Sequence, residues 1–238
     1  MIIMGHLPNA NAALAALKFV KRGMTLGLGT GTTADFFIDS LAKRNQEENL
    51  RLACIPTSVS SERRASSAGL RTVGFQQASR IDLAVDGADV VSKDLHLLKG
   101  MGGALAREKF VAYRARKFVV IVDESKLRAN LEGIVAIETI PFASPAVLRD
   151  VSKISKTASL RTRADSKPFL TDNGNHIIDA RMALKYPERT ERDLNSIPGV
   201  VESGIFTRAD VVLVGTETGC RVLRSKRVYS YSPFSRRE

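Results

Sequence analysis

Apolar runs alternate with amphipathic segments along the first 130 residues, and short polar connections separate them. Runs such as Phe118–Val122 (FVVIV) lack polar alternation, which is typical of strands buried on both faces. The predicted strands are Met24–Gly29, Leu50–Ile55, Leu70–Phe75, Ile81–Val85 and Phe118–Val122, and the predicted helices are Ala12–Val20, Ala34–Leu41, Ser61–Ala68 and Ala104–Ala115. This alternation predicts a parallel sheet with helices on both faces.

Residues 132–206 have a different pattern, which predicts strand, helix, strand, strand, helix, strand. The predicted elements are strands Ile134–Ile140, Leu160–Arg163, His176–Ile178 and Val200–Ile205, the helix Ala146–Ile154 and a second helix before Val200. The segment Thr171–Asn175 (TDNGN) is a strong turn signal between two of these strands. The order βαββαβ is that of a ferredoxin-like unit, and Asp210–Val214 then reads as a strand that rejoins the first sheet. We therefore predict an α/β fold, in which a Rossmann-like parallel-sheet domain (1–131 plus 207–238) is interrupted by a small α+β domain (132–206).

Small hydroxyl, acidic or glycine residues directly follow five of the predicted strands. Because ligands of open parallel sheets bind at the carboxyl ends of the strands, we expect a binding crevice there. The five segments are Thr30–Thr33, Pro56–Ser58, Asp86–Asp89, Asp123–Lys126 and Gly215–Thr216.

The glycine-rich segment Gly27–Thr33 (GLGTGTT) leads into a predicted helix. It does not match the dinucleotide fingerprint GxGxxG, which requires glycine at position 32, and it lacks the GK[ST] ending of a Walker A loop. Its backbone N–H groups and threonine hydroxyls at a helix N-terminus favour a phosphate or a carboxylate. A plain strand-to-helix turn is the alternative.

Three acids and a lysine are candidates for chemistry. Asp86 and Asp89 are close enough to raise each other's proton affinity, although an aspartate that caps a turn is the alternative. Lys99 precedes a glycine-rich run that lets the backbone approach a ligand. Glu108 has Leu105 one turn before it and apolar residues one turn after it. Burial on this face raises the pKa of a carboxyl group toward the range of a general base, whereas a surface ion pair is the alternative.

Composition and charge exclude several other classes. The 238 residues are 44% hydrophobic and 26% charged, as in globular proteins, and no window is apolar enough to span a membrane. The N-terminus lacks the pattern of a secretory signal, and two cysteines, Cys54 and Cys220, form no disulfide framework, so we expect a cytoplasmic protein. The isolated histidines His6, His96 and His176 predict no metal site.

The net charge of +11 is concentrated at the C-terminus, because residues 221–238 carry six basic side chains and one acid. Tyr229, Tyr231 and Phe234 lie among these charges, as they would in a nucleic-acid-binding arm. Basic tails are more often simply solvated. We therefore expect a small anionic substrate, with nucleic-acid binding by the tail as the less favoured alternative.

Six motifs together resemble one family, ribose-5-phosphate isomerase type A, in order and spacing from about residue 12 to residue 216. The motifs are GLGTGTTADFFI, VDGAD, LKGMGGALAREK, VDESK, TDNGNHIID and LNSIPGVVESGIF. The resemblance implies cofactor-free interconversion of D-ribose 5-phosphate and D-ribulose 5-phosphate through an enediolate, in the non-oxidative pentose phosphate pathway. It also implies a homodimer or a homotetramer.

The resemblance implies roles for individual residues. Glu108 would move a proton between C2 and C1, Asp86 and Asp89 would serve ring opening and hydroxyl proton transfer, and Lys99 would stabilise negative charge on oxygen. The implied substrate-binding residues are Thr30, Gly31, Thr32, Thr33, Gly87, Ala88, Gly100, Met101, Gly102 and Lys126.

Three positions depart from the family pattern. Val90 stands where the family usually has an acid, and Asn9–Asn11 stands where members often carry a lysine near the phosphate. Met101 replaces a glycine, so either its side chain points away from the substrate or the backbone there shifts. These departures bear on substrate affinity more than on the type of reaction.

Two other functional classes share parts of the pattern. A non-catalytic sugar-phosphate sensor of a transcription regulator would carry a helix-turn-helix, for which the residues before Met24 leave no room. An acyl-CoA transferase-like enzyme would use Glu108 as a nucleophile and would leave the Asp86–Asp89 turn unexplained.

Overall fold

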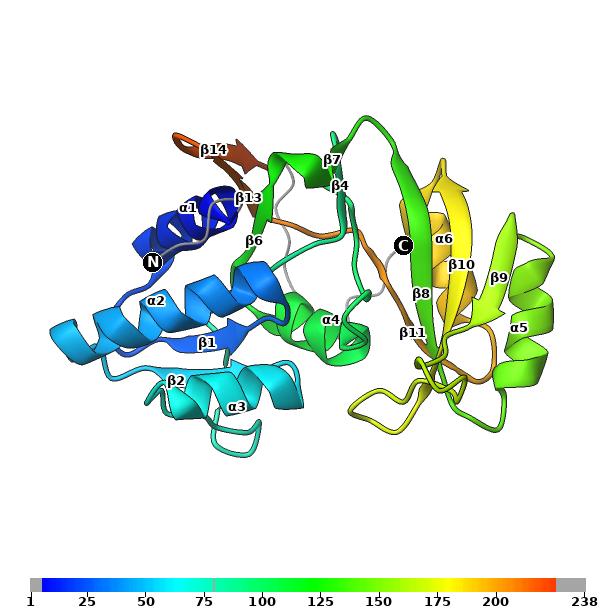
Figure 1. The fold of residues 1–238 in the computed structure, drawn as a ribbon, viewed down its shortest axis with the longest axis horizontal. Helices are drawn as coiled ribbons and strands as arrows, with labels where there is room; N and C mark the ends of the chain where they lie inside the picture. The colour runs from blue at the N-terminus through cyan, green and yellow to red at the C-terminus, as the bar shows by residue number, and fades with distance from the viewer. Residues whose placement is uncertain (1–5, 79, 226–238) are drawn as a thin grey trace, which may run out of the picture.

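A six-stranded sheet in the order β14-β13-β6-β3-β1-β2 organises the larger part of the computed structural model, which describes residues 6–78 and 80–225 (Figure 1). Its strands are β1 (Thr25–Leu28), β2 (Ala53–Pro56), β3 (Leu83–Asp86), β6 (Phe118–Asp123), β13 (Val211–Thr216) and β14 (Gly219–Arg224). All neighbouring strands are parallel except β13 and β14. This confirms the predicted Rossmann-like parallel sheet, and β13 rejoins it beside β6 as expected.

Helices cover both faces of this sheet. One face packs on α1 (Leu7–Ala16), α2 (Thr32–Glu48) and α3 (Val59–Ser67), and the other packs on α4 (Leu105–Arg114). Two short 3-10 helices, η1 (Leu17–Phe19) and η2 (Glu124–Lys126), follow α1 and β6. Alternation along β6 explains the two layers, because Val119 and Ile121 belong to the first core and Val120 and Val122 to the second.

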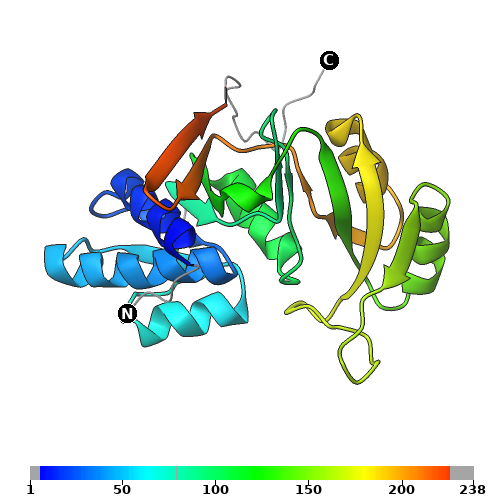
Figure 2. The same cartoon turned by 45° about the horizontal axis from the view of Figure 1, so that its top comes forward.

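A separate four-stranded antiparallel sheet, ordered β11-β8-β10-β9, lies beside the first (Figures 1 and 2). Its elements are β8 (Leu131–Thr139), α5 (Ser144–Ser152), β9 (Thr157–Leu160), β10 (His176–Leu184), α6 (Pro187–Asn195) and β11 (Val200–Ser203). Both helices pack on one face of the sheet, and Ala136 and Ile177 on its other face contact Leu105 of α4. The βαββαβ order and this strand order confirm the inserted ferredoxin-like α+β fold.

A third sheet, ordered β12-β5-β4-β7, was not predicted. Its strands are β4 (Val90–Ser92), β5 (Leu97–Leu98), β7 (Leu127–Arg128) and β12 (Ile205–Phe206). Strands of two or three residues are too short to show any period in the sequence. They matter for function because β5 leads directly into Lys99 and β4 follows the Asp86–Asp89 turn.

Several predicted elements were wrong in place or extent. Leu70–Phe75 is not a strand, since only Thr72 forms an isolated bridge, to Cys54. Helix α1 begins five residues before its predicted start, at Leu7. Arg221 and Arg224 belong to edge strand β14 rather than to a free tail, and the rest of that tail, with its aromatic residues, lies outside the described residues.

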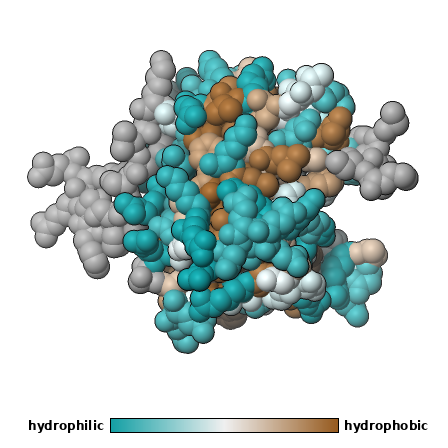
Figure 3. All heavy atoms as spheres, turned by 90° about the vertical axis from the view of Figure 1, so that its left-hand side faces the viewer, coloured by the Kyte–Doolittle hydropathy of each residue, from teal (hydrophilic) through white to brown (hydrophobic). Residues whose placement is uncertain are grey.

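The face that carries α1 and β14 shows a hydrophobic patch surrounded by hydrophilic side chains (Figure 3). These two elements pack against each other, and each exposes an apolar residue, Leu14 and Val222 respectively. Strand β14 also pairs with β13, so it is an integral edge of the large sheet.

Candidate active site

A cavity of about 350 Å³ opens at the carboxyl ends of β1, β3 and β6. The turn after β1, the turn after β3 and the first turns of α4 form its walls. The lining residues are His6, Asn9, Thr30, Gly31, Thr32, Thr33, Gly87, Ala88, Asp89, Lys99, Gly100, Gly102, Glu108, Asp123 and Lys126. This is the edge of the sheet at which the strand-end pattern predicts a ligand.

A buried cluster of one lysine and two acids adjoins this cavity. Lys99 Nζ donates to Gly87 O at 2.6 Å and lies 3.1 Å from Asp86 Oδ2 and 3.4 Å from Glu108 Oε2. All three charged side chains are almost completely buried. Asp86 Oδ2 and Glu108 Oε2 form no hydrogen bond with any described residue. Each acid therefore keeps one oxygen that only the charge of Lys99 compensates.

Burial and mutual repulsion change the proton affinities of this cluster. Burial and then the charge of Asp86 raise the pKa of Glu108 to about 8, although Lys99 acts in the opposite direction. Burial likewise raises the pKa of Asp86. Burial lowers the pKa of Lys99, but the surrounding carboxylates outweigh it, so the pKa of Lys99 is raised overall. Lys99 therefore stays charged, and Glu108 keeps its proton to a higher pH than a free carboxyl group does.

Asp89, the second acid of the turn after β3, lies in the cavity wall and is oriented by the backbone. Met101 N donates to Asp89 Oδ2 at 3.1 Å, and Asp89 N donates to Leu98 O at 2.9 Å. The Met101 side chain is 57% exposed and is absent from the cavity lining. The backbone of Met101 thus contacts the site, while its side chain does not line it.

The turn after β1 presents hydrogen-bond donors to an anion. Gly31 is the N-cap of α2 with φ +104°, and no side chain caps this helix. Its first-turn N–H groups, at Thr32 and Thr33, are therefore left for a ligand. Lys126 adds a positive charge to the same cavity. A phosphate group matches this set of donors.

Two features of the chain hold the turn in place. Gly29 is required, because a Cβ at this position would overlap the Asp86 carboxylate. Thr30 Oγ1 donates to Ser58 Oγ at 2.8 Å and lies 2.9 Å from Thr57 Oγ1. The strand end at Pro56–Ser58, which the sequence places in the crevice, therefore supports the turn from behind and is absent from the cavity lining.

The cavity also contains three residues that were not among the predicted site residues, His6, Asn9 and Asp123. Asn9 Oδ1 accepts a hydrogen bond from Thr33 Oγ1 at 3.0 Å. Asp123 ends β6 and belongs to the segment Asp123–Lys126, which the strand-end rule places in the crevice. Asn9 belongs to the segment that stands in place of the family's lysine near the phosphate, whereas His6 lies before the predicted start of the first helix and had no such signal. The remaining strand end, Gly215–Thr216, lines a neighbouring hollow instead.

Among residues 6–78 and 80–225, no group of three or more His, Cys, Asp or Glu side chains is arranged to hold a metal ion. Within the same residues, no helix has both the length and the hydrophobicity that a membrane crossing needs.

Comparison with known proteins identifies the family. Residues 53–219 match the family described as ribose 5-phosphate isomerase A (phosphoriboisomerase A). The chain belongs to the ribose-5-phosphate isomerase A family. This confirms the resemblance seen in the six motifs.

Relatives in this family match along nearly the whole chain. Ribose-5-phosphate isomerase A from Methanococcus aeolicus is 45% identical over 222 residues, which cover 91% of this chain and 94% of that protein. The structure of ribose 5-phosphate isomerase A from Methanocaldococcus jannaschii has a TM-score of 0.88 at 43% identity and covers 91% of this chain and 97% of that chain. A D-ribose-5-phosphate isomerase solved in complex with phospho-erythronic acid has a TM-score of 0.87 at 41% identity, with the same two coverages.

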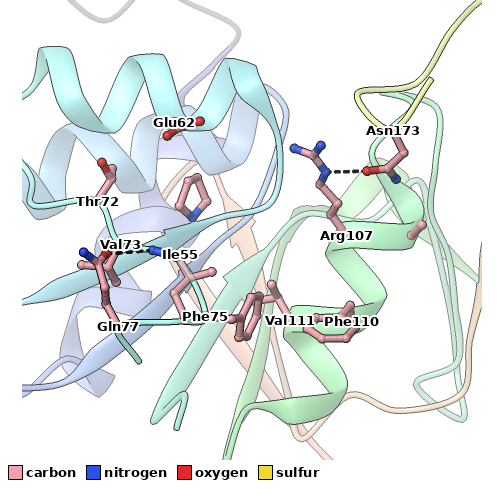
Figure 4. Close-up of a pocket in the computed structure, with 13 residues that line it drawn as sticks. Ile55, Glu62, Thr72, Val73, Phe75, Gln77, Arg107, Phe110, Val111 and Asn173 are labelled. Carbon is pink, nitrogen blue, oxygen red and sulfur yellow. Dashed lines mark hydrogen bonds between the residues drawn. The ribbon is translucent and has the colours of Figure 1, made fainter. Parts of the chain in front are cut away.

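A larger hollow of about 670 Å³ also borders α4 (Figure 4). Its wall includes Phe75 and Phe110, whose rings meet edge to face at 4.9 Å, and Arg107, which bonds Asn173. None of the predicted catalytic or substrate-binding residues lines it. The smaller cavity, which holds the buried acids and the anion-binding turn, is therefore the candidate active site of this ribose-5-phosphate isomerase A family member.

Proposed function

We propose that this protein interconverts D-ribose 5-phosphate and D-ribulose 5-phosphate through an enediolate, in the non-oxidative pentose phosphate pathway. Membership of the ribose-5-phosphate isomerase A family supports the overall reaction. The observation that carries the mechanism is the buried Asp86–Lys99–Glu108 cluster beside an anion-binding cavity.

Glu108 is the proposed base that removes the proton from C2 of the open-chain aldose and returns it to C1. Its pKa of about 8 supports this role, because a base with a pKa near the working pH can accept a proton and release it again. The electron pair left at C2 forms the C1=C2 bond of the enediolate, and negative charge develops on oxygen. Lys99 stabilises that charge from its fixed position between the acids.

Asp86 and Asp89 are the proposed groups for ring opening and for proton transfer between the sugar hydroxyls. The backbone of Gly87, Ala88, Gly100 and Gly102 would contact the sugar chain. Residues Thr30–Thr33 and Lys126 would hold the phosphate, for which the uncapped N-terminus of α2 offers N–H donors. The phospho-erythronic acid complex of a relative supports a phosphorylated sugar as the ligand class.

We also propose a cytoplasmic homodimer or homotetramer that assembles through residues 132–206. The turns on either side of α5 expose large apolar residues, Phe142, which is 95% exposed, and Ile154, which is 60% exposed. Such residues are enriched in interfaces between copies. The molar mass in solution, compared between wild type and Phe142→Asp, tests this assembly.

Ketose formation from D-ribose 5-phosphate, followed with and without EDTA, tests the proposed reaction. We expect turnover that the chelator leaves unchanged. Binding of the sugar phosphate by a folded protein without turnover would contradict the proposal and favour the sensor, and inhibition by the chelator would contradict the cofactor-free mechanism.

A further inference from the structure

The Thr171–Asn175 turn, which the proposed mechanism does not use, is built around a buried carboxylate. Glu138 on β8 is completely buried, and its Oε1 accepts hydrogen bonds from Thr171 Oγ1 (3.0 Å), Asn173 Nδ2 (3.0 Å) and Asn175 Nδ2 (2.8 Å). A carboxylate is strongly disfavoured away from water unless hydrogen bonds replace its hydration. The three donors thus fix the shape of the turn on the edge of the small sheet.

This turn is bonded to the helix that carries Glu108. Arg107 Nε donates to Asn173 Oδ1 at 2.7 Å, and Arg107 Nη2 donates to Asp172 O at 2.9 Å. Figure 4 shows the first of these bonds, with the guanidinium group reaching from α4 toward the turn. Arg107 directly precedes Glu108 in the first turn of α4. The two bonds therefore anchor the backbone that positions the Glu108 carboxylate.

The same turn is also bonded to the N-terminus of α3, which supports the anion-binding wall of the cavity from behind. Val59 N, at the first position of α3, donates to Asp172 Oδ2 at 2.7 Å. The N-cap of that helix, Ser58, accepts a hydrogen bond from Thr30 Oγ1 at 2.8 Å. Thr30 itself lines the cavity. One turn of the small sheet thus connects to both the proton-transfer wall and the anion-binding wall.

We propose that the Thr171–Asn175 turn is a positioning element that fixes the position of these two walls relative to each other. It positions Glu108 through Arg107, and it positions Thr30 through Val59 and Ser58. The proposal rests on the proposed isomerase function. None of the residues of the turn lines the cavity, so each acts on the reaction through another residue. The small sheet thereby contributes to catalysis without supplying a group that touches the substrate.

Steady-state kinetics of Arg107→Ala and Arg107→Lys test the connection to Glu108. We expect kcat to fall about 10-fold in Arg107→Ala with KM within twofold, because small displacements of a catalytic group slow the chemical step. Arg107→Lys can make only one of the two bonds, so its kcat should lie between those of wild type and Arg107→Ala. Asn173→Ala also leaves one of the two bonds, from Arg107 to Asp172 O, so its kcat should likewise lie between those of wild type and Arg107→Ala, and the double variant should be no slower than the slower single variant. Arg163→Ala, which removes an exposed arginine that pairs with Asp165 in the same connection, is the matched control.

Asp172→Ala tests the other wall, and we expect a KM about fivefold higher with a smaller change in kcat, because Thr30 belongs to the anion-binding turn. Circular dichroism and thermal unfolding establish that each variant is folded. If Asn173→Ala does not fold, Arg107→Ala and Arg107→Lys test the proposal instead. Arg107 is partly exposed, so we expect both of these variants to fold. Unchanged kcat in folded Arg107→Ala, or additive losses in the double variant, would overturn the proposal. An inactive wild type would refute the isomerase function instead.

Discussion

Two buried lysines, Lys99 and Lys109, each lie between two carboxylates and beside a cavity, yet their surroundings differ. Lys109 Nζ donates to Glu191 Oε1 and to Glu202 Oε1, both at 2.8 Å. Further donors bond these acids: Thr207 Oγ1 donates to Glu191 Oε2 at 2.8 Å, and Asn195 Nδ2 and Ser203 N donate to Glu202 Oε1. Around Lys99 the distances are longer, and Asp86 and Glu108 each keep an oxygen without a hydrogen bond to a described residue.

The comparison shows that burial of charge does not by itself mark a catalytic site. A cluster in which several donors of the protein bond the acids holds two segments together, here α4 and the chain around α6 and β11. A cluster that is left incomplete carries an energetic cost and keeps atoms for a substrate. Glu108 and Lys109 are neighbours on α4, so one helix carries a member of each kind.

Replacing the lysine of each cluster with methionine should distinguish the catalytic cluster from the structural one. Lys99→Met has the larger expected effect. We expect kcat/KM to fall about 100- to 1,000-fold, as for loss of an oxyanion donor. Steady-state ketose formation measures this loss. A fall of less than tenfold would show that Lys99 does not stabilise the charge of the intermediate.

Lys109→Met should instead lower stability. We expect the free energy of unfolding to fall by about 3–5 kcal/mol, because Glu191 and Glu202 lose their common buried partner. Denaturant unfolding gives this value, and kcat per folded molecule should stay within threefold of the wild type. A variant of full stability and strongly reduced kcat would reverse the assignment of the two clusters.

The raised pKa of Glu108 predicts a stability cost at high pH. Its pKa is 4.5 in the unfolded reference and about 8 in the folded protein, so the folded state binds this proton more tightly. The stabilisation from this proton is complete below pH 4.5 and is lost as the pH rises through 8. Glu108→Gln avoids the buried charge, so its melting temperature should rise relative to that of the wild type between pH 5 and pH 9. Melting temperatures of the two proteins that change in parallel with pH would contradict this cost of burying the Glu108 charge.

Met101→Ala should have the smallest effect of the set. The Met101 side chain is exposed and outside the cavity lining, and its N–H bond to Asp89 does not depend on the side chain. We expect kcat and KM within about twofold of the wild type, in contrast to the buried residues of the cluster. A larger change in KM would place this side chain over the substrate.

Local patterns were sufficient to predict most of the residues that the structure brings to the cavity, with His6 as an exception. The apolar neighbours of Glu108 predict its burial, and the strand-end rule predicts that Thr30–Thr33, Asp86–Asp89 and Lys126 lie at one edge. These inferences succeed because helix periodicity and the polarity of parallel strands act over a few residues. Asp86 itself lies beneath the lining, where its carboxylate faces Lys99.

Contacts between distant segments could not be predicted in the same way. The short strands β4, β5, β7 and β12 pair across the chain and carry no period of their own. Edge strand β14 has two arginines with Val222 and Leu223 between them, which gives no strand-like alternation, so its charge led us to predict a basic tail instead. Nor does any local signal reveal that Glu138 meets the Thr171–Asn175 turn more than thirty residues later.

The most direct test of the central claim is ketose formation from D-ribose 5-phosphate by wild type and Glu108→Gln, measured side by side with EDTA present. The account predicts that the variant keeps its fold and binds the sugar phosphate but loses about 100- to 10,000-fold in rate. A folded variant that retains more than about a tenth of the wild-type rate would contradict the account and assign the base to another residue.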